Sequence, residues 1–161
     1  MPSYGAVMST DDGEMLARVE EIRSELGSLV GEAVVGFGAF AAPGYVYSGV
    51  RRSAVPGTTW WYHLTNRLRR RRGGALPLQL YLVLTASRIV AVSMETSWRS
   101  ERSGFPIEVM RSWDRSSTTV QVAAGRDGAE VRLTDADGET SLESADLGRG
   151  FNDSFLAALE A

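Results

Sequence analysis

The stretch that decides the fold is LPLQLYLVLTASRIVAVS, which occupies residues 76–93. Two apolar runs of strand length flank Thr85-Ala86-Ser87, and runs separated by such a short polar turn are typical of neighbouring antiparallel strands. The stretch therefore predicts a hairpin at the centre of a β-sheet.

Strand patterns continue on both sides of this hairpin. Further strands are expected at residues 33–40, 45–50 and 105–113. Three short alternating segments at residues 120–122, 131–133 and 140–142 predict a meander, because turn-forming sequences separate them at residues 126–128 and 135–138. The second of these turns, Asp135-Ala136-Asp137-Gly138, resembles a calcium loop, but strands flank it where helices would be required.

A helix is expected at each end of this series of strands. Residues 1–9 form a disordered tail, and residues 10–29 form an amphipathic helix that Gly27 ends. Its apolar stripe is predicted to pack on its own domain, with docking on a second copy as the alternative; it consists of Met15, Val19, Ile22, Leu26 and Leu29. Residues 148–159 form the last helix, with an apolar stripe that includes Phe151, Phe155 and Leu159.

This order of elements predicts a mainly β protein of the α+β class. About seven antiparallel strands would close into a barrel, and the C-terminal helix would plug its open end. The chain of 161 residues, 43% hydrophobic and 23% charged, fits one such domain, from residue 30 to residue 161, with an Arg-rich insertion at residues 51–75.

Composition excludes several classes of protein. The chain has no Cys and one His, so disulfides, thiolate metal sites and most histidine metal sites are excluded. The longest apolar run, residues 33–42, is far shorter than the roughly 20 residues that a membrane-spanning helix needs. The first residues lack the basic and apolar regions of a secretory signal. We therefore expect a cytoplasmic protein.

Charge is distributed unevenly along the chain. Residues 1–32, 33–94, 95–112 and 113–161 carry net charges of −5, +8, 0 and −6, which add up to the −3 of the whole chain. A block of eight Arg without Asp or Glu either binds an anionic partner or is neutralised by the acidic remainder of the molecule. The sequence leaves both options open.

The insertion contains the one surface that suggests binding. Its candidate residues are Trp60, Trp61, Arg67, Arg69, Arg70, Arg71 and Arg72. Paired Trp favour the water–headgroup boundary and clustered Arg favour an anionic leaflet, so this set predicts peripheral membrane binding. The same residue types bind single-stranded nucleic acid, although the acidic pI of about 5.2 makes that partner unlikely. The alternative is that both Trp lie in the core or in a subunit interface and that the Arg run is solvated or neutralised by the acidic meander.

Chemical motifs give no catalytic site. Gly36, Gly38 and Ala41 satisfy the dinucleotide pattern G-x-G-x-x-A, but Pro43-Gly44 prevents the helix that must follow it, and no acidic residue occurs about 20 positions later. His63 has no Cys, and no Ser/Asp pair at readable spacing, to act with. We expect no enzymatic activity, no cofactor and no metal.

The central hairpin resembles the strand pair of bacterial PH-like and GRAM-like domains, in which an L-T-x-x-R element closes the turn. The matching residues here are Leu84, Thr85 and Arg88. Residues 113–115, 131–144 and 151–159 are similar to uncharacterised actinobacterial proteins associated with that fold, and the similarity covers residues 30–160. The resemblance implies a PH-like fold, which hosts lipid-binding, peptide-binding and structural members.

Together these patterns predict a non-enzymatic binding or scaffold module. Its Arg- and Trp-rich insertion would contact an anionic membrane surface or a protein partner, which would make the protein peripheral to the membrane in the first case. Self-association through the N-terminal helix and weak nucleic-acid binding are the alternatives.

Overall fold

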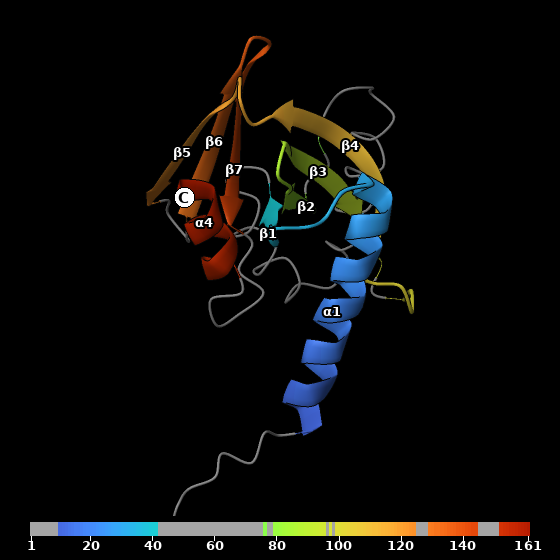
Figure 1. Ribbon diagram of the computed structural model, residues 1–161. Helices are drawn as coiled ribbons and strands as arrows, with labels where there is room; N and C mark the ends of the chain where they lie inside the picture. The colour runs from blue at the N-terminus through green and yellow to red at the C-terminus, as the bar shows by residue number, and fades with distance from the viewer. Residues whose placement is uncertain are drawn as a thin grey trace, which may run out of the picture.

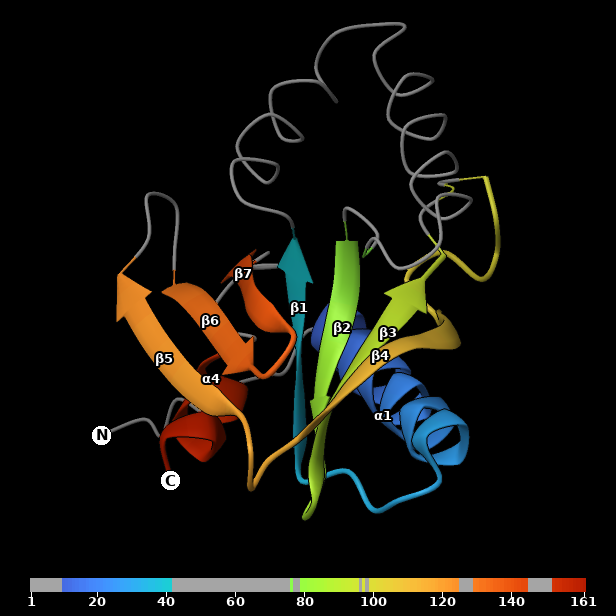
Figure 2. The same cartoon turned by 90° about the horizontal axis from the view of Figure 1, so that it is seen from above.

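The computed structural model describes residues 10–41, 76, 79–95, 97, 99–124, 129–144 and 152–161. These residues form one antiparallel sheet of seven strands and two helices, α1 and α4 (Figures 1 and 2). The strand order across the sheet is β4-β3-β2-β1-β7-β6-β5. The prediction of a mainly β protein with a helix at each end is therefore confirmed.

The first half of the sheet is the meander β1 to β4. Its strands are β1 (Gly36–Ala41), β2 (Gln79–Leu84), β3 (Arg88–Met94) and β4 (Pro106–Asp114). β2 and β3 form the predicted hairpin, in which Leu84 pairs with Ile89 and the amide of Thr85 donates a 2.9 Å hydrogen bond to the carbonyl of Arg88. The strand predicted at residues 45–50 lies outside the described residues.

The second half of the sheet is the predicted C-terminal meander. It consists of β5 (Thr119–Ala124), β6 (Ala129–Asp135) and β7 (Gly138–Ser144). Asp135 pairs with Gly138 across the turn between β6 and β7, which confirms a hairpin turn at this position. Gly138 has a φ of 130°, a conformation that side chains larger than hydrogen rarely allow.

The central strands β2 and β3 are mostly apolar, and both of their faces are buried. On one face, Tyr81 and Val83 of β2 belong to a cluster with Ile22 and Leu26 of α1. On the opposite face, Leu80, Leu82 and Leu84 belong to a second cluster that also contains Trp113, Leu133 and Phe155. A strand that is buried on both faces has a continuous apolar run, as residues 80–84 and 89–92 show.

Helix α1 (Thr10–Val30) covers the first of these faces. It ends three residues beyond the predicted stop, because its buried stripe continues to Val30. Gly31 then adopts a φ of 75°, and its amide donates a 2.9 Å hydrogen bond to the carbonyl of Gly27. The expectation that Gly27 ends the helix was therefore wrong, since Gly31 is the residue with the left-handed conformation.

Helix α4 (Asp153–Glu160) packs beside the second meander (Figure 2). Phe155 is fully buried and meets the ring of Phe40 edge to face at 5.4 Å, while Leu159 is partly buried on the same cluster. The expected packing of these two residues against the sheet is confirmed, but they do not plug a closed barrel. Phe151 lies outside the described residues.

The sheet does not close into the predicted barrel. β1 joins the two meanders through Phe40↔Ser144 and Ala41↔Glu143, and no pairing within the described residues joins β4 to β5. Helix α4 packs against β1 and β2 of the first meander and against β5 of the second. The result is an open, strongly bent sheet with β4 and β5 at its edges.

Candidate functional site

The candidate residues predicted from the sequence lie outside the described residues. Trp60, Trp61, Arg67 and Arg69 to Arg72 all belong to the segment between β1 and β2, as does His63. What the structure describes is the position at which the chain leaves the sheet for this segment and the position at which it returns.

Both positions lie at the same end of one strand pair. Ala41, the last residue of β1, is the register partner of Gln79, the first residue of β2. Five further pairs continue this register from Phe40↔Leu80 to Gly36↔Leu84. The segment 42–78 is therefore carried on a hairpin whose strands are fully paired and buried on both faces.

Asn152, just before α4, holds the other edge of β1 in place. Its side-chain amide donates hydrogen bonds to the carbonyl of Ala39 at 2.7 Å and to Oγ of Ser144 at 2.6 Å. Its Oδ1 accepts a 2.9 Å hydrogen bond from the amide of Ala39. Asn152 thus continues the β1 ladder at the point where the β7 pairing stops. Gly38 leaves room for it, since a Cβ there would lie 2.8 Å from Oδ1.

Arg88 belongs to the basic block by sequence but serves the fold. Its Nε donates a 2.6 Å hydrogen bond to Glu32, and its Nη2 donates to the carbonyl of Val30 at the end of α1. Ser87 also donates to Glu32, at 2.9 Å. The L-T-x-x-R element therefore ties the β2–β3 turn to the end of α1, and Arg88 is removed from the set available to a partner.

Two carboxylates of the acidic meander already have Arg partners among the described residues. Asp135 accepts a hydrogen bond from Arg111 at 3.3 Å, and Glu130 accepts one from Arg132 at 2.8 Å. Arg132 lies in the meander itself, so its pair with Glu130 leaves the net charge of residues 113–161 at −6, whereas Arg111 comes from outside them. Whether the Arg run of residues 67–72 is neutralised within the molecule or binds a partner stays a prediction.

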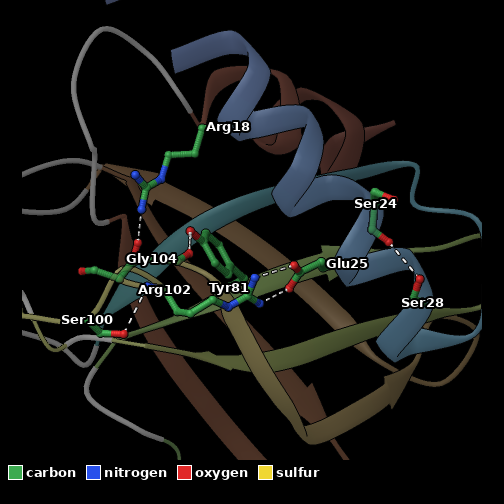
Figure 3. A network of polar contacts seen from close by, with 9 residues as sticks. Arg18, Ser24, Glu25, Ser28, Tyr81, Ser100, Arg102 and Gly104 are labelled. Atoms are coloured by element: carbon green, nitrogen blue, oxygen red, sulfur yellow. Dashed lines mark hydrogen bonds and ion pairs between the residues drawn. The ribbon is translucent and has the colours of Figure 1, made fainter. Parts of the chain in front are cut away.

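A second polar cluster joins α1 to the turn that precedes β4 (Figure 3). Arg102 donates two hydrogen bonds to Glu25, at 2.9 Å and 2.6 Å, which is the two-pronged geometry that Arg offers a carboxylate. Arg18 donates from Nη2 to the carbonyl of Ser103. The Tyr81 hydroxyl donates a 2.6 Å hydrogen bond to the carbonyl of Gly104.

Phe105 lies beneath this cluster. The Cζ atoms of Arg102 and Arg18 lie 4.4 Å and 5.1 Å from its ring centroid, so two cations contact one aromatic ring. Phe105 is nearly buried in the core that α1 shares with the sheet. We define the α1–turn junction as five residues: Arg18, Glu25, Arg102, Ser103 and Phe105. It carries charged side chains on its surface, and Phe105 fixes it in the core.

Contacts at this junction shift the pKa values of its titratable side chains. The hydrogen bonds from Arg102 hold the pKa of Glu25 below its ordinary value, and the same contact raises the pKa of Arg102. Burial raises the pKa of Tyr81 to about 12. Tyr81 is therefore a neutral hydrogen-bond donor at physiological pH.

Sequence reasoning missed this junction and Asn152. Glu25 and Arg102 are 77 positions apart, and the bonded residues Asn152 and Ala39 are 113 apart. The local pattern around each residue carries no signal of its partner. Gly38 was noticed as part of a dinucleotide pattern, but the structure places it inside β1, facing Asn152.

Comparisons of this chain with family models, with curated proteins and with solved structures found no match. Among the described residues, no group of three or more His, Cys, Asp or Glu could hold a metal ion. No helix within the described ranges is long and apolar enough to cross a membrane. The described residues define a mainly β protein with an open antiparallel sheet.

Proposed function

We propose that this protein is a non-enzymatic PH-like binding module that contacts an anionic membrane surface through its Arg- and Trp-rich segment. The observation that carries the proposal is the Ala41↔Gln79 pairing at the base of this segment. Binding residues are commonly carried on connections that a rigid scaffold positions. Seven Arg and two adjacent Trp occupy a connection of this kind, and β1 and β2 are paired along their whole length at its base.

The order of the elements supports a PH-like assignment. A four-strand meander is followed by a three-strand meander and a C-terminal helix, and Phe155 of that helix is buried between the two meanders. The sheet is open, so the PH-like feature that we propose is the order of the two meanders and the C-terminal helix. With this function, we expect the protein to be cytoplasmic and peripheral to the membrane.

Vesicle sedimentation tests the lipid proposal. The variant R69A/R70A/R71A/R72A is compared with the wild-type protein on phosphatidylcholine vesicles with and without phosphatidylserine. Each Arg near an anionic surface contributes on the order of 1 kcal/mol, so the loss of four Arg should lower binding at low salt by on the order of a thousandfold. Raising the salt should weaken wild-type binding as well.

The matched control is the variant R69K/R70K/R71K/R72K, which keeps the charge. It should bind almost as well as the wild type, because attraction to a leaflet depends mainly on charge. Equal binding by the wild type and the Ala variant would remove the lipid proposal. Binding of a labelled single-stranded oligonucleotide, lost in the Ala variant, would favour the nucleic-acid alternative.

Self-association through α1 is the second candidate. Ile22 and Leu26 of the predicted stripe are buried against the sheet, whereas Met15 is 62% exposed and the adjacent Leu16 is 56% exposed. Leu29 near the end of α1 is also exposed, so the apolar surface of α1 available to a second copy lies in its first half and in its last turn. Sedimentation equilibrium tests this candidate, since a monomeric mass at high concentration would contradict it.

A further inference from the structure

Strand β5 forms one edge of the open sheet, and its outer side has no partner strand within the described residues (Figure 2). An edge strand presents a row of unpaired backbone N–H and C=O groups, with which another strand can pair. Natural proteins protect such edges with charged side chains, Pro, β-bulges or a covering helix. The two edges of this sheet differ in these protections.

The opposite edge, β4, is protected in several ways. Its pairing with β3 contains two register shifts, which are typical of bulges. The strand begins at Pro106, and α1 contacts it. Its charged residues are Glu108, Arg111 and Asp114. These features oppose the addition of a further strand to β4.

Strand β5 has no charged residue, no Pro and no register shift. Its sequence is TVQVAA, and its six residues pair in unbroken order with β6. Val120 and Val122 pack against the second core cluster and are partly buried, while Gln121 on the opposite face is exposed. Helix α4 contributes to the same cluster as the two Val, so it covers one face of β5 and not its outer side. An unprotected edge of this kind is suited to pairing with another strand.

The occupant that fits this edge is the β5 strand of a second copy, because the strand is self-complementary in the antiparallel direction. When Gln121 lies opposite Gln121 of the second copy, Val120 lies opposite Val122 of that copy. Thr119 then lies opposite Ala123. Residues directly opposite one another have their side chains on the same face, so the apolar face of one copy continues into that of the other.

Self-pairing also leaves no unprotected edge. Two copies joined through β5 use both β5 edges, and the outermost strands of the combined sheet are then the two protected β4 strands. A two-fold pairing in which the same surface is used by both copies is closed, so the assembly ends at a dimer.

The charges on and beside β5 permit this contact. The strand is uncharged, and the sequence on each side of it, at residues 114–115 and 126–127, contains one Asp and one Arg. On β6, Arg132 pairs with Glu130 of its own copy. Three strand spacings would separate Arg132 from Arg132 of the second copy, roughly 14 Å, which exceeds the screening length of about 10 Å at 0.1 M salt.

We propose that β5 is a homodimerisation surface, to which a second copy of the chain adds its own β5 in the antiparallel direction. The two sheets become one continuous sheet across the two-fold axis. This contact uses neither the Arg- and Trp-rich segment nor the exposed residues of α1.

Sedimentation equilibrium of the full chain and of two charge variants tests the pairing. The wild-type mass should rise with concentration to twice that of one chain. Gln121→Lys and Gln121→Glu each place like charges opposite one another, so each variant alone should raise the dissociation constant of the dimer on the order of tenfold. An equimolar mixture of the two variants should restore the dimer, because opposite charges then meet. A mixture that associates no better than the separate variants would overturn the proposal.

Thr134→Lys is the matched control for charge. Thr134 is exposed on β6, and the substitution adds the same charge one strand away from the proposed contact. This variant should dimerise as the wild type does. A loss equal to that of Gln121→Lys would show a general effect of charge and would contradict pairing through β5.

Cross-linking gives a second measurement of the same contact. The chain has no Cys, so a single introduced Cys reports on the separation of two copies. Gln121→Cys should form a disulfide-linked dimer under mild oxidation much faster than Thr134→Cys, which β5 separates from the second copy. Equal rates for the two positions would overturn the proposal.

Three further results would overturn it by indicating another state. A wild-type protein that stays monomeric at every concentration would exclude the dimer. Loss of the dimer in Met15→Ser/Leu16→Ser would assign the contact to α1. Loss of the dimer at high salt, or when Arg at residues 69–72 are changed to Ala, would show that the basic segment of one copy binds acidic residues of the other.

Discussion

At the scale of single residues, the packing between Gly38 and Asn152 is the tightest constraint in the described structure. A Cβ at Gly38 would lie 2.8 Å from Oδ1 of Asn152 and 2.9 Å from the Phe40 ring. Asn152 is 2% exposed and uses its amide to bind β1 and β7. Asn152 is fixed by its hydrogen bonds and Phe40 lies in the core, so neither side chain can move easily to make room for a Cβ.

The substitution Gly38→Ala should therefore destabilise the protein by about 2 kcal/mol, the usual range for overpacking a filled core. Urea unfolding followed by circular dichroism measures this loss. Gly13→Ala is the matched control, since Gly13 lies in α1 with nothing within 4 Å of the added Cβ. Ala favours a helix over Gly, so the control should be stabilised by up to about 1 kcal/mol. Equal stability of Gly38→Ala and the wild type would contradict the close packing.

At the scale of elements, α1 is attached to the sheet by an apolar stripe and by ion pairs at two places. Ile22, Leu26 and Val30 are buried, while Glu25–Arg102 and Glu32–Arg88 fix one side and the end of the helix. Exposed ion pairs contribute little free energy, so the buried stripe provides most of the attachment. The Glu25–Arg102 pair instead holds the turn at residues 99–105 against the helix. The Glu32–Arg88 pair holds the end of the helix beside the β2–β3 turn.

The Glu25–Arg102 pair predicts a dependence of stability on pH. The pKa of Glu25 is lowered in the folded protein from its ordinary value of 4.5, so its charge stabilises the fold above that pH. This stabilisation is lost as the pH falls through the lower, folded value. Glu25→Gln removes the charge and should reduce stability at neutral pH by less than about 1 kcal/mol.

Unfolding by urea at several pH values between 7 and 3 checks this expectation. The difference between wild type and Glu25→Gln should shrink as the pH falls below 4.5. Glu20→Gln, which removes an exposed carboxylate from the same helix, should follow the wild type at every pH. A constant difference for Glu25→Gln would show that the pair is not formed in solution.

At the scale of the whole molecule, the Arg- and Trp-rich segment begins and ends at one paired strand end. The chain leaves the sheet after Ala41 and returns at Gln79, and these two residues are register partners. We therefore expect that the segment can be shortened while the pairing of β1 with β2 is kept.

Replacing residues 43–74 with a short Gly-Ser linker should leave the sheet intact. The replacement keeps Leu76, which packs on the second core cluster, and a short turn suffices because Ala41 and Gln79 are register partners. We expect cooperative thermal unfolding and no binding to anionic vesicles. Loss of cooperative unfolding would show that the core requires residues 43–74.

The sequence alone predicted most of the elements, because their patterns are local. The apolar runs of residues 76–93 predicted the central hairpin, and the alternation in residues 119–144 predicted the last meander. The predicted binding residues are local too, since Trp60, Trp61 and the Arg run follow closely along the chain; whether they bind a membrane stays a prediction.

The tertiary structure alone decided how these elements meet. Whether β4 pairs with β5, and where Asn152, Phe105 and Arg102 find their partners, depends on residues that are far apart in the chain. A periodic pattern shows which face of a strand is buried, but it does not identify what buries that face. The contacts of α4 with β1, β2 and β5, and of α1 with β4, likewise join elements that are distant in sequence.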